Sequence, residues 1–114
     1  MNVEEFREYC LKKKGVTEEF PFDNSTIVFK VAGKMFALAN VDEFTGINLK
    51  CDPEKAIELR EKYEGVKPGW HMNKKHWNTV EVGRVNQKLL REWIDDSYEL
   101  VVASLPKKEK VKIG

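Results

Sequence analysis

The clearest structural signal in the chain is the sequence TIVFKVAGKMFALA, residues 26–39. Ile27, Phe29 and Val31 recur at every second position, which is the period of a strand with one face in the core. The Ala32-Gly33 pair predicts a tight turn, and the apolar residues after it predict a second strand. We therefore expect a β-hairpin over these residues.

Further strands are predicted on the C-terminal side of this hairpin. Residues 46–51 alternate in the same way, with Asn48 and Lys50 pointing away from the core. Residues 66–70 predict a short strand, and residues 76–82 predict a longer one. Together with the hairpin, these segments predict a five-stranded sheet.

Three helices are predicted around these strands. Asn2, followed by Glu5 at the spacing of a capping box, predicts the start of a first helix. Asp52-Pro53, a cap followed by proline in the first turn, predicts a second. A third amphipathic segment covers residues 86–105, and Asp95-Asp96-Ser97 predicts a break or a fresh cap within it.

The resulting element order is α-β-β-β-α-β-β-α, which predicts an α+β two-layer domain with helices on one face of an antiparallel sheet. Residues 1–106 form this single domain, and residues 107–114 are expected to be a short, basic, mobile tail. The other sheet face, which includes Thr26 and Lys30, is left open to water or to a partner.

Length and composition limit the class of protein. A chain of 114 residues with 41% hydrophobic content is long enough for one domain with a real core. It has no apolar run of the roughly 20 residues that a membrane span needs, and no signal-peptide pattern. We therefore expect a cytoplasmic protein with no membrane partner, in which Cys10 and Cys51 are buried, reduced thiols.

The formal net charge of +1 hides an asymmetry between the two parts of the chain. Residues 1–64 contain 10 basic and 13 acidic residues, a net charge of −3, whereas residues 65–114 contain 10 and 6, a net charge of +4. This local excess is well short of the domain-wide basicity typical of a dedicated nucleic-acid binder.

The segment PGWHMNKKHWNTV, residues 68–80, contains both histidines, two of the three tryptophans and a lysine pair. Cationic side chains neutralise phosphates and aromatic faces accept bases, so this segment favours weak contact with nucleic acid, most simply DNA. The candidate contact residues are Lys74, Lys75, His76, Arg84 and Asn73, extended by Lys30, Lys34 and Lys50. An equally simple interpretation is structural, with one buried tryptophan, one hydrogen-bonded histidine and two solvated lysines.

A second hypothesis is a domain that binds a protein or a small ligand. Trp70, His71, Met72 and Trp77 would then line a pocket against the open sheet face, and binding would depend little on salt. An enzyme is the third and weakest hypothesis. His71 or His76 has the chemistry of a general base, but the sequence offers no nucleophile or oxyanion donor to act with it.

No metal, cofactor or covalent catalysis is expected. His71 and His76 are five residues apart with no cysteine or carboxylate between them, and the lysine pair between them repels a cation. The side chains that could act as nucleophiles lack an activating setting: Ser97, Ser104 and Cys51. The glycines occur singly, so no phosphate-binding loop is present.

Several short motifs resemble the MmcQ/YjbR family: Glu19 to Phe22, Gly33 to Ala37, Asn48 to Cys51, Pro68 to Lys74, His76-Trp77 and Ser97-Tyr98. The resemblance spans nearly the whole chain. It implies a two-layer α+β fold similar to secretion-chaperone-like domains, in a small bacterial cytoplasmic protein. Members are commonly labelled as DNA-binding, with a double-wing arrangement proposed to contact the duplex. The matching positions implied as contacts are His71, Asn73, Lys74, His76 and Trp77.

Overall fold

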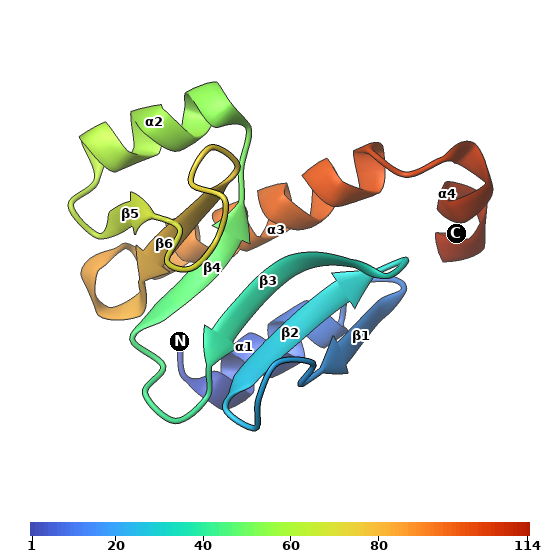
Figure 1. Ribbon diagram of the computed structural model, residues 1–114, viewed down its shortest axis with the longest axis horizontal. Coiled ribbons are helices and arrows are strands. Elements are labelled where there is room, and N and C mark those ends of the chain that lie inside the picture. The colour runs from blue at the N-terminus through green and yellow to red at the C-terminus, as the bar shows by residue number, and fades with distance from the viewer.

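A computed structural model describes all 114 residues as a six-stranded antiparallel sheet with helices packed on one side (Figure 1). The strands lie in the order β1-β2-β3-β4-β6-β5. The elements in chain order are α1 (Val3–Leu11), β1 (Val16–Glu19), β2 (Thr26–Val31), β3 (Lys34–Asn40), β4 (Gly46–Lys50), α2 (Pro53–Lys62), β5 (Val66–Pro68), β6 (Trp77–Glu81), the 3-10 turn η1 (Val82–Arg84), α3 (Gln87–Ala103) and α4 (Lys107–Ile113). The predicted α+β class is confirmed.

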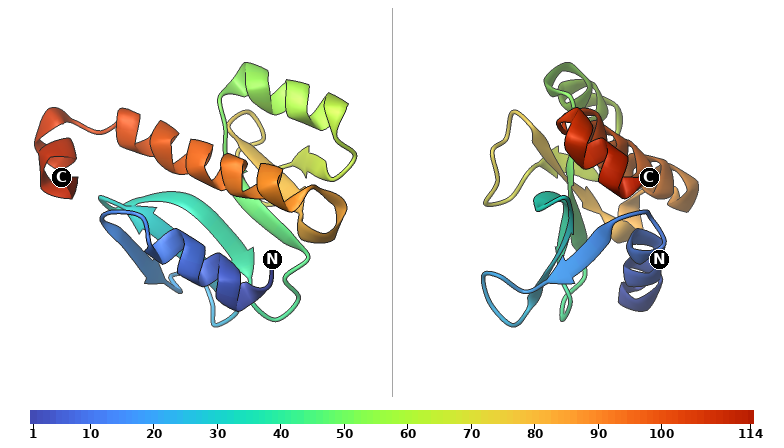
Figure 2. Two further views of the ribbon diagram at one scale, coloured as in Figure 1. Left: turned by 180° about the vertical axis from the view of Figure 1, so that it is seen from behind. Right: turned by 90° about the vertical axis from the view of Figure 1, so that its right-hand side faces the viewer.

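The main core lies between the sheet and the helices. Helices α1 and α3 run across the same side of the sheet, as the rear view in Figure 2 shows. The largest cluster of buried side chains joins these helices to the central strands, and it includes Phe6, Cys10, Phe29, Phe36, Ile47, Leu90, Ile94 and Val101. None of the helices combines the length and the apolar character needed to cross a bilayer.

The hairpin predicted from residues 26–39 is formed by β2 and β3. Val31 pairs with Lys34, so the turn contains only Ala32 and Gly33, and both have positive φ, 50° and 77°. Two positive φ values are typical of the type I′ turn, whose twist matches that of the flanking strands. The turn therefore sets the pairing of Val31 with Lys34 and of Lys30 with Met35, and a β-bulge beyond it shifts the register by one residue, so that Phe29 pairs with Ala37.

The predicted helix starts are also confirmed. The Asn2 side chain accepts a hydrogen bond from the Glu5 amide at 2.8 Å, and the Glu5 side chain accepts one from the Asn2 amide at 3.2 Å, which completes the capping box. Asp52 caps α2, with Pro53 in its first turn. Each cap satisfies amide groups that a helix leaves unpaired at its N-terminus.

Three segments differ from the sequence-based prediction. Strand β1 was not predicted, because its four residues include Glu18 and Glu19 and only one apolar side chain, Val16. Charged residues of this kind are common on edge strands, where they discourage pairing with another chain. The segment predicted as a tail forms α4, whose Ile113 packs against the core.

The predicted break within the last amphipathic segment is wrong, because α3 is continuous through Asp95 and Ser97. Ser97 is fully buried, and its hydroxyl donates to the Phe36 carbonyl at 2.5 Å and accepts from the Lys50 amide at 2.9 Å. Polar side chains that find partners in neighbouring strands have no need to cap a new helix.

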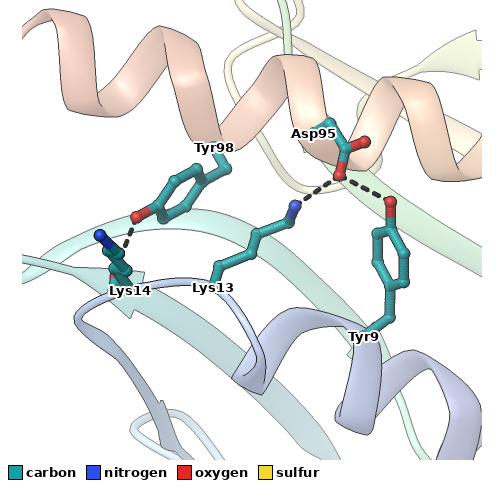
Figure 3. A network of polar contacts seen from close by, with 5 residues as sticks. All are labelled: Tyr9, Lys13, Lys14, Asp95 and Tyr98. Carbon is teal, nitrogen blue, oxygen red and sulfur yellow. Dashed lines mark hydrogen bonds and ion pairs between the residues drawn. The ribbon is translucent and has the colours of Figure 1, made fainter.

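A polar network joins α1 to the middle of α3 (Figure 3). The Asp95 carboxylate accepts hydrogen bonds from Tyr9 and Lys13, and the Tyr98 hydroxyl donates to the Lys14 carbonyl at 2.6 Å. Partial burial, and then the hydrogen bond to Asp95, raises the pKa of Tyr9 to about 12. These contacts fix the angle between the two helices that cover the core.

The Ala32 conformation generates a stability prediction. A non-glycine residue with positive φ is strained by roughly 1–2 kcal/mol, and asparagine tolerates this region best. Replacing Ala32 with Asn is therefore expected to raise the free energy of unfolding by roughly 0.5–1 kcal/mol, measured by urea denaturation. The matched Ala32→Val variant should be less stable than the wild type. If Val is tolerated as well as Asn, the turn does not have the type I′ conformation.

The polar network generates a second prediction. Because the pKa of Tyr9 is raised in the folded state, the neutral hydroxyl contributes stability that is complete below pH 10 and is lost as the pH rises through about 12. Titration of tyrosinate absorbance should show the Asp95→Asn variant ionising Tyr9 at lower pH than the wild type does. Tyr9→Phe identifies the Tyr9 signal, and an unchanged midpoint in Asp95→Asn would contradict the network.

Candidate binding site on the open face of the sheet

The sheet face opposite the helices carries a small apolar cluster and a loop that folds over it. Val28, Leu38 and Trp77 are buried there, and Met35 and Met72 pack against them. The loop of residues 69–76, which joins β5 to β6, projects from this side of the sheet in the right-hand view of Figure 2. The loop therefore covers the apolar cluster, and the rest of this face is not covered by a helix.

The sequence of the loop explains its close approach to the sheet. A Cβ atom on Gly69 would lie 2.7 Å from the Cβ of Trp77, so only glycine fits at this position. The Trp70 amide donates to the Thr79 hydroxyl at 2.9 Å, and the Trp70 carbonyl accepts from the Asn48 side-chain amide at 3.2 Å. Thr79 in turn donates to Asn48. Two hydrogen bonds thus tie Trp70 to β4 and β6, and a third joins these two strands beneath it.

The other end of the loop is fixed by Arg60 from α2. Its guanidinium donates to the Lys74 carbonyl and, at 2.7 Å, to the Oδ1 atom of the buried Asn78. The Asn78 amide donates at 3.3 Å to the Ala56 carbonyl. Neither Arg60 nor Asn78 was singled out from the sequence, and together they connect α2 to β6 and to the loop.

The loop presents two aromatic side chains to the surface. Trp70 has an exposed fraction of 72%, and its ring centroid lies 4.2 Å from that of His71. His71 has a positive φ of 58°, a conformation that is uncommon for residues with a side chain. Strained backbone of this kind occurs most often at binding and catalytic sites.

A cavity of about 400 Å³ lies beside this loop on the open face. Trp70, His71 and Met72 line one wall, and Phe22 and Asp23 from the β1–β2 loop also line the cavity. Residues of β3, β4 and β6 and of the β3–β4 loop complete the lining, among them Leu38, Asn40, Glu43, Asn48 and Thr79. This size falls within the range of small-molecule sites.

The loops around the cavity are tied to one another. The Ser25 hydroxyl donates to Asp42 at 2.9 Å, and the Val41 amide donates to the Ser25 carbonyl at 2.8 Å. Asp23 accepts hydrogen bonds from the amides of Ser25 and Thr26 at 2.8 Å and 2.6 Å, and these bonds hold its pKa below the usual value. The Asp23 carboxylate is therefore ionised at neutral pH.

The predicted pocket residues are brought together in part. Trp70, His71 and Met72 line the cavity, whereas Trp77 lies beneath the loop with an exposed fraction of 7% and belongs to the apolar cluster. Asp23 and Glu43 were not predicted, because they lie on separate loops that only the sheet topology brings to one cavity.

The predicted nucleic-acid contacts are distributed more widely. Asn73, Lys74 and Lys75 are exposed on the loop, and His76 follows them half-buried at the start of β6. Lys50 pairs in register with Trp77, next to the loop. These five residues occupy one region of the surface.

The other three predicted contacts lie elsewhere or carry partners. Arg84 follows the far end of β6 and is ion-paired with Glu64 at 3.1 Å and Glu81 at 3.5 Å. Lys30 is ion-paired with Glu19 at 3.2 Å. Lys34 begins β3, directly after the Ala32-Gly33 turn.

The structure has no metal site, and a second cavity is smaller than the one on the open face. No group of three or more histidine, cysteine or acidic side chains is arranged to hold a metal ion. A smaller cavity of about 130 Å³ lies between α2 and α3, and the Lys55–Asp96 ion pair, at 3.4 Å, comes from two of its lining residues. The open face therefore carries the main candidate site.

Comparison with known proteins gives the relatives of this chain. The family model described as YjbR matches residues 11–100. The uncharacterised protein YbdF of Escherichia coli O157:H7 is 43% identical over 82% of this chain and 79% of its own length. YjbR of Escherichia coli K12, also uncharacterised, is 31% identical over 96% of this chain and 95% of its own.

Solved structures show the same fold. The crystal structure of Deinococcus radiodurans protein DR2400, with domain DUF419, superposes with a TM-score of 0.92 at 38% identity. The superposition covers 99% of this chain and 88% of that one. A Pseudomonas syringae protein superposes with a TM-score of 0.74 at 32% identity, over 88% of this chain and 98% of that one.

The loop geometry predicts how substitutions at Gly69 and His71 change the stability of the protein. Gly69→Ala is expected to lower the free energy of unfolding by roughly 1–3 kcal/mol, because the added methyl group collides with Trp77. His71→Gly should leave stability unchanged or raise it by up to roughly 1 kcal/mol, since glycine adopts positive φ without strain. Urea denaturation measures both. If the two variants lose equal stability, the loop does not lie against the sheet as described.

Proposed function

The chain belongs to the YjbR family, and we propose that it is a non-enzymatic binding protein whose ligand site is the cavity on the open face of the sheet. The observation that carries this proposal is the cavity itself, with an aromatic wall formed by Trp70 and His71. Cavities of this size with convergent aromatic and polar groups are the usual form of a small-molecule site.

The fixed position of the loop supports the same proposal. Trp70 is bonded through its backbone to Asn48 and Thr79, so its backbone is held beside the cavity before any ligand arrives. A preformed wall lowers the entropy that binding costs. Neither histidine is hydrogen-bonded to a serine, threonine or cysteine side chain, which favours recognition over catalysis.

Nucleic-acid binding is the second candidate function. Lys74 and Lys75 are exposed and form no ion pair within 4.0 Å, and they lie on the same loop as the exposed Trp70. Free lysines next to an exposed aromatic ring suit phosphate contact and base stacking. In this function the partner is DNA, bound weakly and with little regard to sequence, in the cytoplasm.

Trp70 offers a direct test of the cavity. Trp77 and Trp93 are each only 7% exposed, so an external ligand should act mainly on Trp70 emission. We expect at least one member of a probe set containing choline, benzoate and adenosine to change this emission saturably in the wild type. The change should be absent in Trp70→Phe and kept in the Lys74→Ala/Lys75→Ala variant. If none of these probes binds, the cavity is not a small-molecule site of this kind.

The DNA candidate is tested by titration with short duplex and single-stranded DNA at several salt concentrations. If Lys74 and Lys75 contact phosphates, log affinity should fall linearly with log salt, and the double alanine variant should reduce the slope by about 2, roughly one per lysine. Lys107→Ala/Lys108→Ala on α4 is the matched control for charge. An unchanged slope in the Lys74/Lys75 variant would remove this surface from consideration.

A further inference from the structure

The charged side chains that line the open-face cavity are all acidic. Its lining includes two carboxylates, Asp23 and Glu43, and no lysine or arginine. Glu43 is exposed and forms no ion pair within 4.0 Å, and Asp23 is ionised at neutral pH because two backbone amides bind its carboxylate. With histidines neutral, the formal charge of the lining is negative. An anionic ligand would be repelled from it.

Several uncharged polar side chains of the cavity already form hydrogen bonds within the protein. Asn48 donates to the Trp70 carbonyl and accepts from Thr79, and Thr79 accepts from the Trp70 amide. The Asn40 carbonyl oxygen accepts from the amides of Asp42 and Glu43 at 2.9 Å and 3.0 Å. Asp23 also accepts bonds, on Oδ1 from two amides and on Oδ2 from the Thr26 hydroxyl at 3.2 Å, but an ionised carboxylate has about four acceptor sites, so the two carboxylates are the strongest acceptors of the lining.

Two of the apolar side chains in the lining are aromatic and exposed. Phe22 has an exposed fraction of 64% and Trp70 one of 72%, although both are large apolar side chains that normally gain by burial. Phe22 lies on the β1–β2 loop and Trp70 on the β5–β6 loop, and both line the same cavity. Aromatic faces attract cations electrostatically.

We propose that this cavity binds a small organic cation, with an alkylammonium group held by the aromatic rings of Phe22 and Trp70 and by the carboxylates of Asp23 and Glu43. The inference rests on the proposed function, because it assigns a ligand class to the same cavity. An alkylammonium group satisfies both parts of the lining at once, since its methyl or methylene groups contact the rings and its charge faces the carboxylates.

The same chemistry has two sources, a free amine and the lysine side chain of a peptide. A volume of about 400 Å³ accommodates either of them. Choline serves as the probe for the first source, and the tripeptide Ala-Lys-Ala, acetylated and amidated, serves for the second. A neutral isostere of choline, 3,3-dimethylbutanol, and its anionic counterpart, 3,3-dimethylbutyrate, separate the effect of charge from that of shape.

The experiment is a titration of Trp70 emission in the full chain with these four probes. We expect at least one of the two ammonium probes to bind roughly tenfold more tightly than the neutral isostere, and the anion to bind most weakly. Tighter choline binding identifies a free amine, and tighter peptide binding identifies a lysine side chain. Either result supports the proposal, because both ligands carry an alkylammonium group.

Two isosteric variants locate the charge effect. Asp23→Asn keeps the Oδ1 acceptor for the Ser25 and Thr26 amides, so the turn is retained, and Glu43→Gln changes only the charge of an exposed side chain. Each should weaken ammonium binding roughly twofold to fivefold. Glu92→Gln, an exposed carboxylate on α3, carries the same loss of charge away from the cavity and should have no effect.

The outcomes separate this inference from the function on which it rests. If the neutral isostere or the anion binds as tightly as the ammonium probes, the cavity is a ligand site but the cation inference is wrong. Equal affinity in wild type, Asp23→Asn and Glu43→Gln would also overturn it. If none of the four probes changes Trp70 emission, the cation inference is wrong, and the search with uncharged and acidic probes decides separately whether the cavity binds any ligand.

Discussion

The two-residue turn between β2 and β3 begins the strand pairing that decides which side chains lie on each face of the sheet. The turn sets the pairing next to it, and a β-bulge that leaves Phe36 unpaired shifts the register by one residue, so that Phe29 pairs with Ala37. In the observed register, Phe29 and Ala37 face α1 and α3, whereas Val28 and Leu38 face the other side. The sheet therefore has two apolar faces of very different size.

The smaller apolar face determines where the candidate site forms. Val28 and Leu38 are covered by Trp77 and by the loop of residues 69–76 rather than by a helix. A loop covers less surface than a helix does, so part of the sheet beside it stays open, and Trp70 is held at its edge. The acidic loops from the other end of the sheet complete the cavity. The candidate site is thus a consequence of incomplete coverage of the second face.

The sequence predicted the elements whose signals are local. The alternation in residues 26–39, the capping box at Asn2 and the Asp52-Pro53 helix start each depend on residues a few positions apart, and all were found. Strand β1 and the continuity of α3 were missed, because the first depends on pairing with β2 and the second on partners for Ser97 in β3 and β4.

The site was predicted only in part for the same reason. Trp70, His71 and Met72 are neighbours in sequence and also in the cavity, so a dense motif was enough to identify them. Asp23 and Glu43 reach the cavity through the order of the strands, and the ion pairs of Arg84 and Lys30 depend on residues distant in sequence. Charge counting along the chain therefore overstated the basic surface.

We propose that this protein binds its partner on the open face of the sheet and not on the helical face. The most direct measurement is an NMR map of backbone amide shifts in isotopically labelled protein as choline and, separately, short single-stranded DNA are added. We expect the shifts for any bound probe to concentrate in residues 69–76 and in the loops that contain Asp23 and Glu43. Shifts confined to α2 and α3, or to α4, would contradict it.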